Sequence, residues 1–402
     1  MKRQQQILPD DIVIVAAKRS AIGKFGGSLR NMAAIELASS VIIDALQSYG
    51  IATDNVDEVI VGNVGGWGAN GFLARAAALS AQLPVTSTAY SVNRQCGSSL
   101  QAVINGVQSL LLNRSKLVLA GGVESISTLP FYNCSLRWGS KMGNVQLRDG
   151  VMDILTWPLD MSHNGITAEN VARKFKITRE QQDEYALLSQ KRAANAVKDN
   201  IFNKEITPIE IKDKRGQFSI FEKDEGPRVD VSMAKLAALK PCFMHDDAAT
   251  VTAGNSSSLN DGSAFLALTK RSVARSMGLA TLATIRDWAI AGCDPAIMGY
   301  APFYSTQKLC QQINLSPSCI DMIEINEAFA AQVIAVQHDL KVPIDKLNIY
   351  GGGISLGHPL GATGAILLTK CVHELQRSDK EDAMISMCIG GGQGISLYIT
   401  KE

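Results

Sequence analysis

The sequence predicts an α/β protein with a largely buried mixed sheet, because short apolar runs alternate with amphipathic helical patterns along most of its 402 residues. The two ends of the chain also follow one order: strand, glycine-bearing corner, helix, strand and a pair of glycines. This repeat of pattern, without a repeat of residue identity, predicts a pseudo-twofold pair of sheets whose helix-start corners face a shared site.

The first half of the chain follows this alternation closely. A Gly-rich loop over 20–28 follows its first strand, and Pro84 stops its second helix. The run over 88–92 reads as a short buried strand. From their apolar spacing we expect strands at 12–17, 56–61, 88–92 and 116–120, and helices at 33–49, 73–83 and 97–111.

The middle of the chain departs from this pattern, because charged and polar turns become frequent, as in 212–216. A long amphipathic helix is expected over 178–200, and it begins with the capping box Thr178-Arg179-Glu180-Gln181. We interpret this part as an inserted subdomain outside the core sheet.

The last part returns to the alternation. A strand ending at Ile325 leads into a helix over 328–340, and the elements after it repeat the order of the first half: a strand at 347–350, a helix at 362–375, a strand at 383–387 ending at Cys388, and a strand at 395–399. The predicted domains are an N-terminal half, 1–126 completed by 250–282, an inserted loop subdomain, 127–249, and a C-terminal half, 283–402.

The composition fits a globular protein, with 46% hydrophobic residues, 19% charged residues and a net charge of +1. The chain has no basic surplus that would favour nucleic acid as a partner. It also has no run of 18 apolar residues, so we expect no membrane span. Residues 1–11 resemble neither a signal peptide nor a transit peptide. The eight cysteines contain no C-x-x-C pair, so we expect reduced thiols in a cytoplasmic protein and no metal site.

Cys96 lies at a predicted strand-to-helix corner, where Gly97 allows a tight turn and leaves room for a ligand. Free N–H groups and the positive end of the helix dipole stabilise a thiolate at such a corner, so we expect the pKa of Cys96 to be lowered. A reactive thiol and a buried structural cysteine are both consistent with this stretch.

Two corners of the last part carry further candidate groups. His358 stands before a helix in GGGISLGHPLG, where it could exchange protons near neutral pH or serve only as a structural residue in a turn. Cys388 lies beside the glycines of IGGGQG, whose N–H groups can point at an oxyanion, although it could equally be a buried cysteine in a flexible loop.

Two other polar stretches have similar alternatives. Asn326 could hold a water or an oxygen, and Glu327 could be only a helix-start charge. The small and hydroxylic residues of 250–262 could line a narrow tunnel for a thin ligand or form only a hydrogen-bonded turn.

Together these stretches resemble the thiolase family, in the family's order and over about residues 12–400. The matching motifs are NRQCGSSLQA around Cys96, GGVES at 121–125, TAENVA at 167–172, TVTAGNSSSLNDG at 250–262, NEAFAAQ at 326–332, GGGISLGHPLGATG at 351–364 and CIGGGQG at 388–394. The resemblance implies a thiolase-like duplicated α/β core in five layers, αβαβα, whose two halves have mixed sheets, with an inserted loop subdomain.

Carried over by position, the resemblance implies that Cys96 takes an acyl group from CoA and that His358 removes the thiol proton. Cys388 would exchange a proton with the methyl carbon of a second acetyl-CoA. One oxyanion site would be His358 with a water held by Asn326, and the other would be the N–H groups of Cys96 and Gly390. CoA thioesters would be substrates, and no cofactor or metal would be bound permanently.

The resemblance also assigns residues around the substrate. Glu327 would orient the polar cluster, and Met298 and Phe329 would wall the acyl end. Arg228 would lie near the nucleotide end of CoA, and the pantetheine path would be lined by Leu155, His163, Ser232, Ala253 and Ser257.

Departures from the family's pattern concern the acyl end. Asn164 stands where the family often has methionine, Trp157 and Pro158 could reshape the pocket wall, and 244–249 is slightly longer than the family's turn. The acyl-chain preference therefore stays open at this point.

The implied activity is the reversible Claisen condensation of two acetyl-CoA molecules to acetoacetyl-CoA and CoA. The alternative within the family is a degradative 3-ketoacyl-CoA thiolase of broader chain length, and the alternative of another class is a non-catalytic CoA- or lipid-binding protein. Cys388 argues against a ketoacyl synthase, because decarboxylative condensation needs no thiol base there.

The segment LRWGSKMG, 136–143, resembles the loop that joins two dimers in the biosynthetic branch of the family. Aromatic and Arg-containing patches fit the cores of interfaces, so we expect a homotetramer built as a dimer of dimers. The alternative is that Trp138 and Met142 fold back onto the inserted subdomain.

Overall fold

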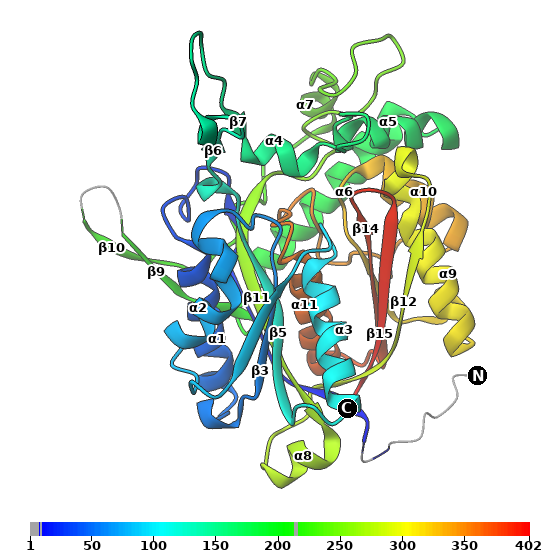
Figure 1. The fold of residues 1–402 in the computed structure, drawn as a ribbon. Coiled ribbons are helices and arrows are strands. Elements are labelled where there is room, and N and C mark those ends of the chain that lie inside the picture. The colour runs from blue at the N-terminus through cyan, green and yellow to red at the C-terminus, as the bar shows by residue number, and fades with distance from the viewer. Residues whose placement is uncertain (1–7, 9, 213–215) are drawn as a thin grey trace.

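The chain folds into five layers, helix–sheet–helix–sheet–helix, which Figure 1 shows side by side. The computed structural model describes residue 8 and residues 10–212 and 216–402, so residues 1–7, 9 and 213–215, with most of the N-terminal stretch considered above, lie outside the description. The predicted α/β class and the five implied layers are confirmed.

A mixed sheet forms both β layers. Its strands are β1 (Ile12–Ser20), β2 (Gly23–Lys24), β3 (Glu58–Gly62), β4 (Thr88–Val92), β5 (Leu117–Ser125), β8 (Ile206–Thr207), β11 (Asn260–Lys270), β12 (Ala283–Gly292), β13 (Met322–Ile325), β14 (Asp382–Ile389) and β15 (Gln393–Lys401). They follow the order β13-β14-β15-β12-β1-β11-β5-β3-β4, with β2 beside β11 and β8 beside β1.

The two predicted sheets are joined into one sheet where β1 of the first half pairs with β12 of the second. β1 and β12 pair only through Val13–Thr284 and Ile14–Ala283, whereas β1 follows β11 along most of its length. Each half therefore forms its own layer, and the short junction joins the layers edge to edge. Apolar strand residues such as Val13 and Ile14 are fully buried, as expected for a sheet covered on both faces.

Helices cover and separate the two β layers. α3 (Ser98–Leu111) and α11 (Thr363–Arg377) pack against each other between them, and α11 is buried on nearly every side. The outer layers are α1 (Ala34–Ser48) and α2 (Leu73–Ser80) on one side, and α9 (Ala301–Ile313) and α10 (Ala330–Leu340) on the other. α8 (Arg271–Ser276) connects β11 to β12.

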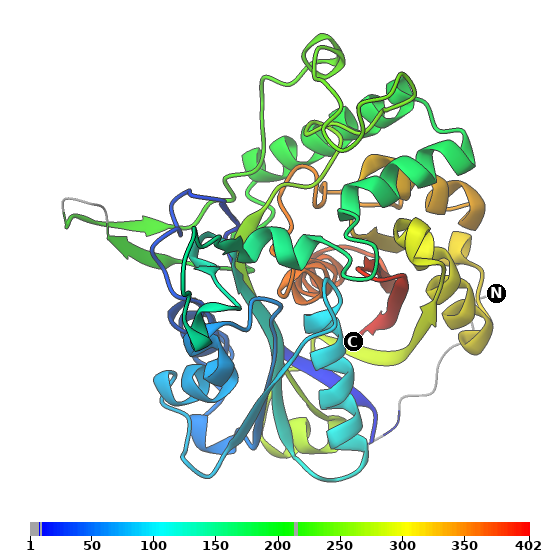
Figure 2. The same ribbon diagram turned by 45° about the horizontal axis from the view of Figure 1, so that its top comes forward.

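Residues 127–249 lie mainly at one end of the layers, around the end of α11 that Figure 2 brings forward. The predicted capping box on Thr178 is confirmed at the start of α6. Besides β8, this part contains β6 (Phe131–Tyr132), β7 (Arg148–Asp149), β9 (Ile209–Lys212), β10 (Phe218–Phe221), α4 (Gly150–Leu155), α5 (Asn164–Phe175), α6 (Arg179–Lys198) and α7 (Met233–Ala237). The exact domain boundaries stay a prediction.

Two strand predictions need correction. The strand over 88–92 exists but is not buried, because β4 is an edge strand with β3 as its only neighbour in the path, and Tyr90 is exposed. The strand over 347–350 does not form. Leu347 makes one bridge to Ile323, and then Asn348 adopts a left-handed conformation with φ 46°. The Asn348 side chain replaces the missing strand, since it bonds both the N–H and the carbonyl of Ile325.

Among the described residues, the structure contains no helix that combines the length and apolar character needed to cross a membrane.

Candidate active site

Cys96 lies in the turn between β4 and α3, one residue before the Gly97 N-cap. The left-handed residue of this turn is Gln95, with φ 47°, whereas Gly97 has an ordinary φ of −81°. The expectation that Gly97 provides the tight turn is therefore wrong. Close packing against the opposite half favours glycine at position 97, because a Cβ there would come within 2.7 Å of Ile389 Cδ1.

The thiol of Cys96 is buried, and the backbone N–H of Gly390, from the opposite half of the protein, acts to lower its pKa. Burial raises the pKa of Cys96 to about 11, which outweighs the opposing effect of the N–H bonds from Gly390 and from Cys96 itself. The predicted lowering of this pKa is wrong, because desolvation is larger here than the effect of the helix start. The resting side chain is a neutral thiol.

His358 is buried in the loop that precedes α11, and burial lowers the pKa of its imidazole to about 4. The ring nitrogen Nε2 lies 3.3 Å from Asn326 Nδ2, and Nδ1 lies 2.6 Å from Thr363 Oγ1. The backbone N–H of His358 donates to Asn260 Oδ1 at 2.9 Å. Oδ1 of Asn326 is buried with no hydrogen-bond partner among the described residues. This oxygen can accept a hydrogen bond from a water, as the predicted role of Asn326 requires.

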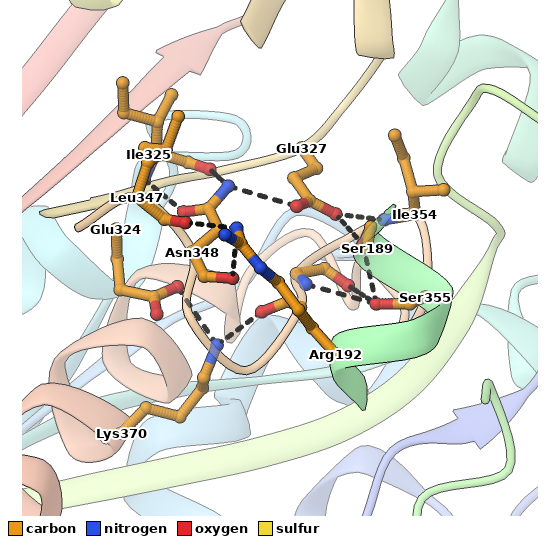
Figure 3. Close-up of polar contacts among 12 residues, drawn as sticks. Ser189, Arg192, Glu324, Ile325, Glu327, Leu347, Asn348, Ile354, Ser355 and Lys370 are labelled. Atoms are coloured by element: carbon orange, nitrogen blue, oxygen red, sulfur yellow. Dashed lines mark hydrogen bonds and ion pairs between the residues drawn. The ribbon is translucent and has the colours of Figure 1, made fainter. Parts of the chain in front are cut away.

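The loop that carries His358 is held by the buried carboxylate of Glu327, and Figure 3 shows its contacts with Ser189, Asn348 and Ile354. Glu327 accepts hydrogen bonds from four donors: Tyr185 Oη at 2.9 Å, Ser189 Oγ at 2.6 Å, Asn348 Nδ2 at 3.1 Å and the Ile354 N–H at 3.2 Å. A buried charge is tolerated when it is satisfied in this way. The contacts fit the predicted orienting role of Glu327.

A buried ion pair holds the start of the same loop. Lys370 Nζ lies 3.0 Å from Glu324 Oε2 and 2.8 Å from the carbonyl oxygen of Gly351 (Figure 3). Arg192 adds a bond from Nη1 to the Leu347 carbonyl at 2.6 Å. Lys370 and Arg192 therefore connect the start of this loop to α11 and α6.

Cys388 lies inside β14 rather than beyond the end of a strand, and it is fully buried. Burial, with the nearby Cys96 thiol as the next cause, raises the pKa of Cys388 well above its usual range. Met298 and Phe329 belong to the same apolar cluster as Cys388, so the structure gathers the predicted acyl wall around the second thiol.

An aromatic contact links this wall to His163. Phe243 packs edge to face on Phe329 with ring centroids 5.9 Å apart, and His163 stacks on Phe243 at 5.0 Å. Nδ1 of His163 accepts the Gly165 N–H at 3.0 Å, so the neutral ring can carry its hydrogen on Nε2.

The departures at Asn164 and Trp157 both face the loop after Cys388. A Cβ at Gly390 would stand 3.7 Å from Asn164 Nδ2, and one at Gly391 would stand 2.8 Å from Trp157 Cζ3. Gly391 has φ +87°, so both its conformation and the Trp157 ring exclude a side chain there.

A cavity of about 490 Å³ opens between the Gly-rich loop and the inserted part. Arg228 and Ala253, two of the residues assigned to CoA from sequence, line it together with the cations Lys24 and Lys235. Ser257 lies between two lining serines, and its N–H donates to the Ala328 carbonyl at 2.9 Å.

Four residues of the predicted pantetheine path are not among those that line this cavity: Leu155, His163, Ser232 and Ser257. Ser232 caps α7, where its hydroxyl accepts the Lys235 N–H at 3.3 Å. Leu155 packs at half burial against the main core. The assignments of Leu155 and Ser232, like that of Arg228, depended on alignment near 155–160 and 244–249, where the chain departs from the family's pattern.

Several residues of the site were missed from sequence. Phe243 and Lys24 showed no pattern, because only the folded chain brings them to His163 and to the cavity. Glu124, in GGVES, accepts N–H bonds from Val64 and Gly361 at 3.0 and 2.9 Å, and burial raises its pKa to about 7. A lone acid in a Gly-rich motif was the signal that could have identified it as a link between the two halves.

The described residues contain no group of three histidine, cysteine or acidic side chains that could hold a metal ion.

The chain matches two family models, the N-terminal thiolase domain over residues 12–272 and the C-terminal thiolase domain over residues 279–401. Acetyl-CoA acetyltransferase of Pseudomonas aeruginosa is 42% identical over 393 residues, which cover 98% of this chain and 100% of the relative.

Solved structures agree with this match. The Bacillus anthracis acetyl-CoA acetyltransferase is 42% identical with a TM-score of 0.94, covering 98% of this chain and 99% of that one. Human mitochondrial 3-ketoacyl-CoA thiolase is 37% identical. One structure of it has a TM-score of 0.95 and covers 98% of this chain and 100% of the human chain. A second structure, in complex with CoA, has a TM-score of 0.93 and covers 98% of this chain and 99% of the human chain. The motifs, the five-layered fold and the near-complete coverage together place this chain in the thiolase family.

Proposed function

We propose that this thiolase is an acetyl-CoA C-acetyltransferase, which condenses two acetyl-CoA molecules to acetoacetyl-CoA and CoA through an acyl group on Cys96. The observation that carries the proposal is the close contact between the Cys96 turn of one half and the Cys388 loop of the other: a Cβ at Gly97 would stand 2.7 Å from Ile389 Cδ1, and one at Gly390 would stand 3.6 Å from Gln95 Cγ. His358 and Asn326 supply the base and an unpartnered oxygen.

In the first half-reaction, Cys96 Sγ attacks the thioester carbonyl while His358 takes the thiol proton. Both groups are neutral at rest, so the base is available and the thiolate forms only as the bond to carbon forms. The tetrahedral oxyanion collapses, the C–S bond to CoA breaks, and the departing sulfur takes the proton of Cys388.

In the second half-reaction, the Cys388 thiolate removes a proton from the methyl carbon of the next acetyl-CoA. Burial raises the pKa of Cys388, which makes its thiolate a stronger base toward a weakly acidic carbon. The enolate carbon attacks the acyl carbon on Cys96, a C–C bond forms, and the sulfur of Cys96 leaves and recovers a proton from His358. Donors aimed at each oxyanion are worth about 10²–10³ in rate.

The CoA moiety would occupy the cavity beside the Gly-rich loop, where Lys24 and Arg228 suit its phosphates. Met298 and Phe329 close the acyl end around Cys388, and the Asn164 amide lies near Gly390, which favours a short acyl group over a long apolar chain. A 3-ketoacyl-CoA thiolase of broader range remains the second candidate, because the human relative has that activity in its name. Thiolysis rates over a series of 3-ketoacyl-CoA lengths separate the two.

The two thiols are expected to behave differently when they are replaced. Cys96→Ser should take no acetyl group from acetyl-CoA, because a serine hydroxyl lacks the acidity of a thiol, yet it should still bind CoA. Cys388→Ala should accept one acetyl group on the Cys96 peptide but lose condensation by about 10²–10⁴, the usual contribution of a general base. Mass spectrometry of the acetylated peptide and a condensation assay measure both. An acetyl group on another residue, or normal condensation by Cys388→Ala, would refute this division of roles.

We also propose that the protein is a cytoplasmic homotetramer, a dimer of dimers without a permanently bound cofactor. Trp138 and Met142 are 91% and 94% exposed, so within one chain they do not fold back onto the inserted part. Apolar side chains that are this exposed to solvent fit a contact with a second dimer.

A further inference from the structure

Thr363 lies against the nitrogen of His358 that faces away from Asn326. Its Oγ1 is 2.6 Å from His358 Nδ1 and 3.0 Å from the carbonyl oxygen of Pro359, four residues earlier. Thr363 and His358 are both buried, at 2% and 4% exposed, so water does not replace either contact. Thr363 is the first residue of α11, which fixes its position relative to the loop.

The number of hydrogens on each group decides which atom donates and which accepts in the contacts of His358, Thr363 and Pro359. A threonine hydroxyl has one hydrogen, and a carbonyl oxygen can only accept. When the hydroxyl donates to Pro359, the common pattern of a helical threonine toward residue i−4, Oγ1 can only accept from Nδ1–H of the imidazole. The second nitrogen is then bare, which suits the amide Nδ2 of Asn326 at 3.3 Å as a donor. Both neighbours of the ring are satisfied by one tautomer.

We propose that Thr363 is a positioning residue that keeps the neutral imidazole of His358 in the Nδ1–H tautomer, so that Nε2 stays unprotonated and can exchange its long contact to Asn326 for the proton of Cys96. This inference rests on the proposed acyl transfer. Among the described residues, Nε2 has only the long contact to Asn326. Nδ1 is occupied by the Thr363 hydroxyl, which is itself bonded to Pro359, so Nε2 is the nitrogen available to a thiol proton. Without the hydroxyl, nearly all of the imidazole population would carry its hydrogen on Nε2 and could not act as the base.

The test compares Thr363→Val, which keeps the shape and removes the hydroxyl, with Thr363→Ser, which keeps the hydroxyl. Two rates are measured near pH 7: acetylation of Cys96 by acetyl-CoA, and alkylation of Cys96 by iodoacetamide without CoA. The second rate reports thiolate formation without the CoA site. We expect Thr363→Val to slow both by about 10²-fold, the lower end of what a general base contributes, and Thr363→Ser to stay within about threefold of wild type.

A matched control lies on the same helix. Thr369 is fully buried and its hydroxyl has no hydrogen-bond partner among the described residues, so Thr369→Val makes the same chemical change without removing a contact. It should leave both rates unchanged. CoA affinity should be equal in all variants, because the proposed role concerns only the base.

The outcomes separate the two levels of the argument. If wild-type Cys96 takes no acetyl group, the proposed function fails. If wild type is acetylated and Thr363→Val shows wild-type rates in both assays, or if Thr363→Ser is as slow as Thr363→Val, the tautomer role is overturned. Melting curves identify a variant that does not fold; Thr363→Ala, which also lacks the hydroxyl and adds no bulk, then provides the same comparison.

Discussion

The loop that carries His358 and the loop that carries Trp138 differ in burial: the first lies in the interior and the second lies on the surface. Every residue of 351–361 is buried, and Glu327 and Lys370 bond its backbone from two sides. Every residue of 134–148 is exposed. The first loop is fixed by contacts within one chain, as a catalytic histidine requires, whereas the second presents apolar side chains that nothing in the chain covers.

This difference shows where the two loops derive their stability. The His358 loop depends on charges that are buried and satisfied, so a single missing partner leaves a costly group in the interior. The Trp138 loop has few such partners, so its order depends on what it contacts outside the chain. Each loop can be tested by a change that should not affect the other.

The largest effect is expected from Lys370→Met, which leaves Glu324 buried without its ion pair. Breaking such a pair costs about 3–5 kcal/mol of unfolding free energy, and activity should fall too because the bond to the Gly351 carbonyl is lost. Urea or thermal unfolding measures the loss. The double variant Glu324→Gln with Lys370→Met should recover part of it.

The control for this variant is Lys235→Met, which breaks a 2.6 Å pair with Asp230 whose side chains are 61% and 74% exposed. Exposed pairs contribute about 0–1 kcal/mol, so this change should leave stability nearly unaltered. Equal losses in the two variants would mean that burial does not distinguish the loops.

A smaller effect is expected from Trp138→Ala, which should convert tetramers to dimers without changing the rate per active site. The reason is that the indole ring has almost no contact within its own chain. Light scattering at micromolar concentration measures the mass. Phe218→Ala, on another exposed hairpin, should leave the tetramer intact. A wild-type dimer, or a tetramer that survives Trp138→Ala, would contradict the proposed contact.

The smallest effect is expected from pH. Burial lowers the pKa of His358 to about 4, so the imidazole stays neutral as pH falls from 8 to 5.5, and it loses its capacity to accept a proton only below that range. The acetylation rate of Cys96 should therefore change little, whereas a histidine with the usual pKa of about 6.5 would lose about tenfold by pH 5.5. Quenched-flow measurement of the acetylated peptide decides this, and a midpoint near 6.5 would show that the imidazole is not desolvated in the working enzyme.

Much of the fold could be predicted from the sequence, because most elements are defined by local periodicity. The helices over 33–49 and 178–200 were placed to within two residues, and the Thr178 capping box formed as expected. The prediction failed at 347–350, where four apolar or polar residues of strand length cannot reveal that Asn348 will use its side chain in place of a strand.

By itself, the sequence determined the order of the elements, the family and the corners on which Cys96, His358 and Cys388 stand, since each depends on residues close together in the chain. Only the tertiary structure decided the protonation of these groups. The helix start at Cys96 favours a thiolate, but desolvation by segments hundreds of residues away keeps the thiol neutral. The tertiary structure also places Phe243 against His163 and brings Lys24 and Arg228 to the same cavity. Local pattern reports which side chains are apolar or reactive, whereas burial and charge depend on every neighbour that the fold brings near.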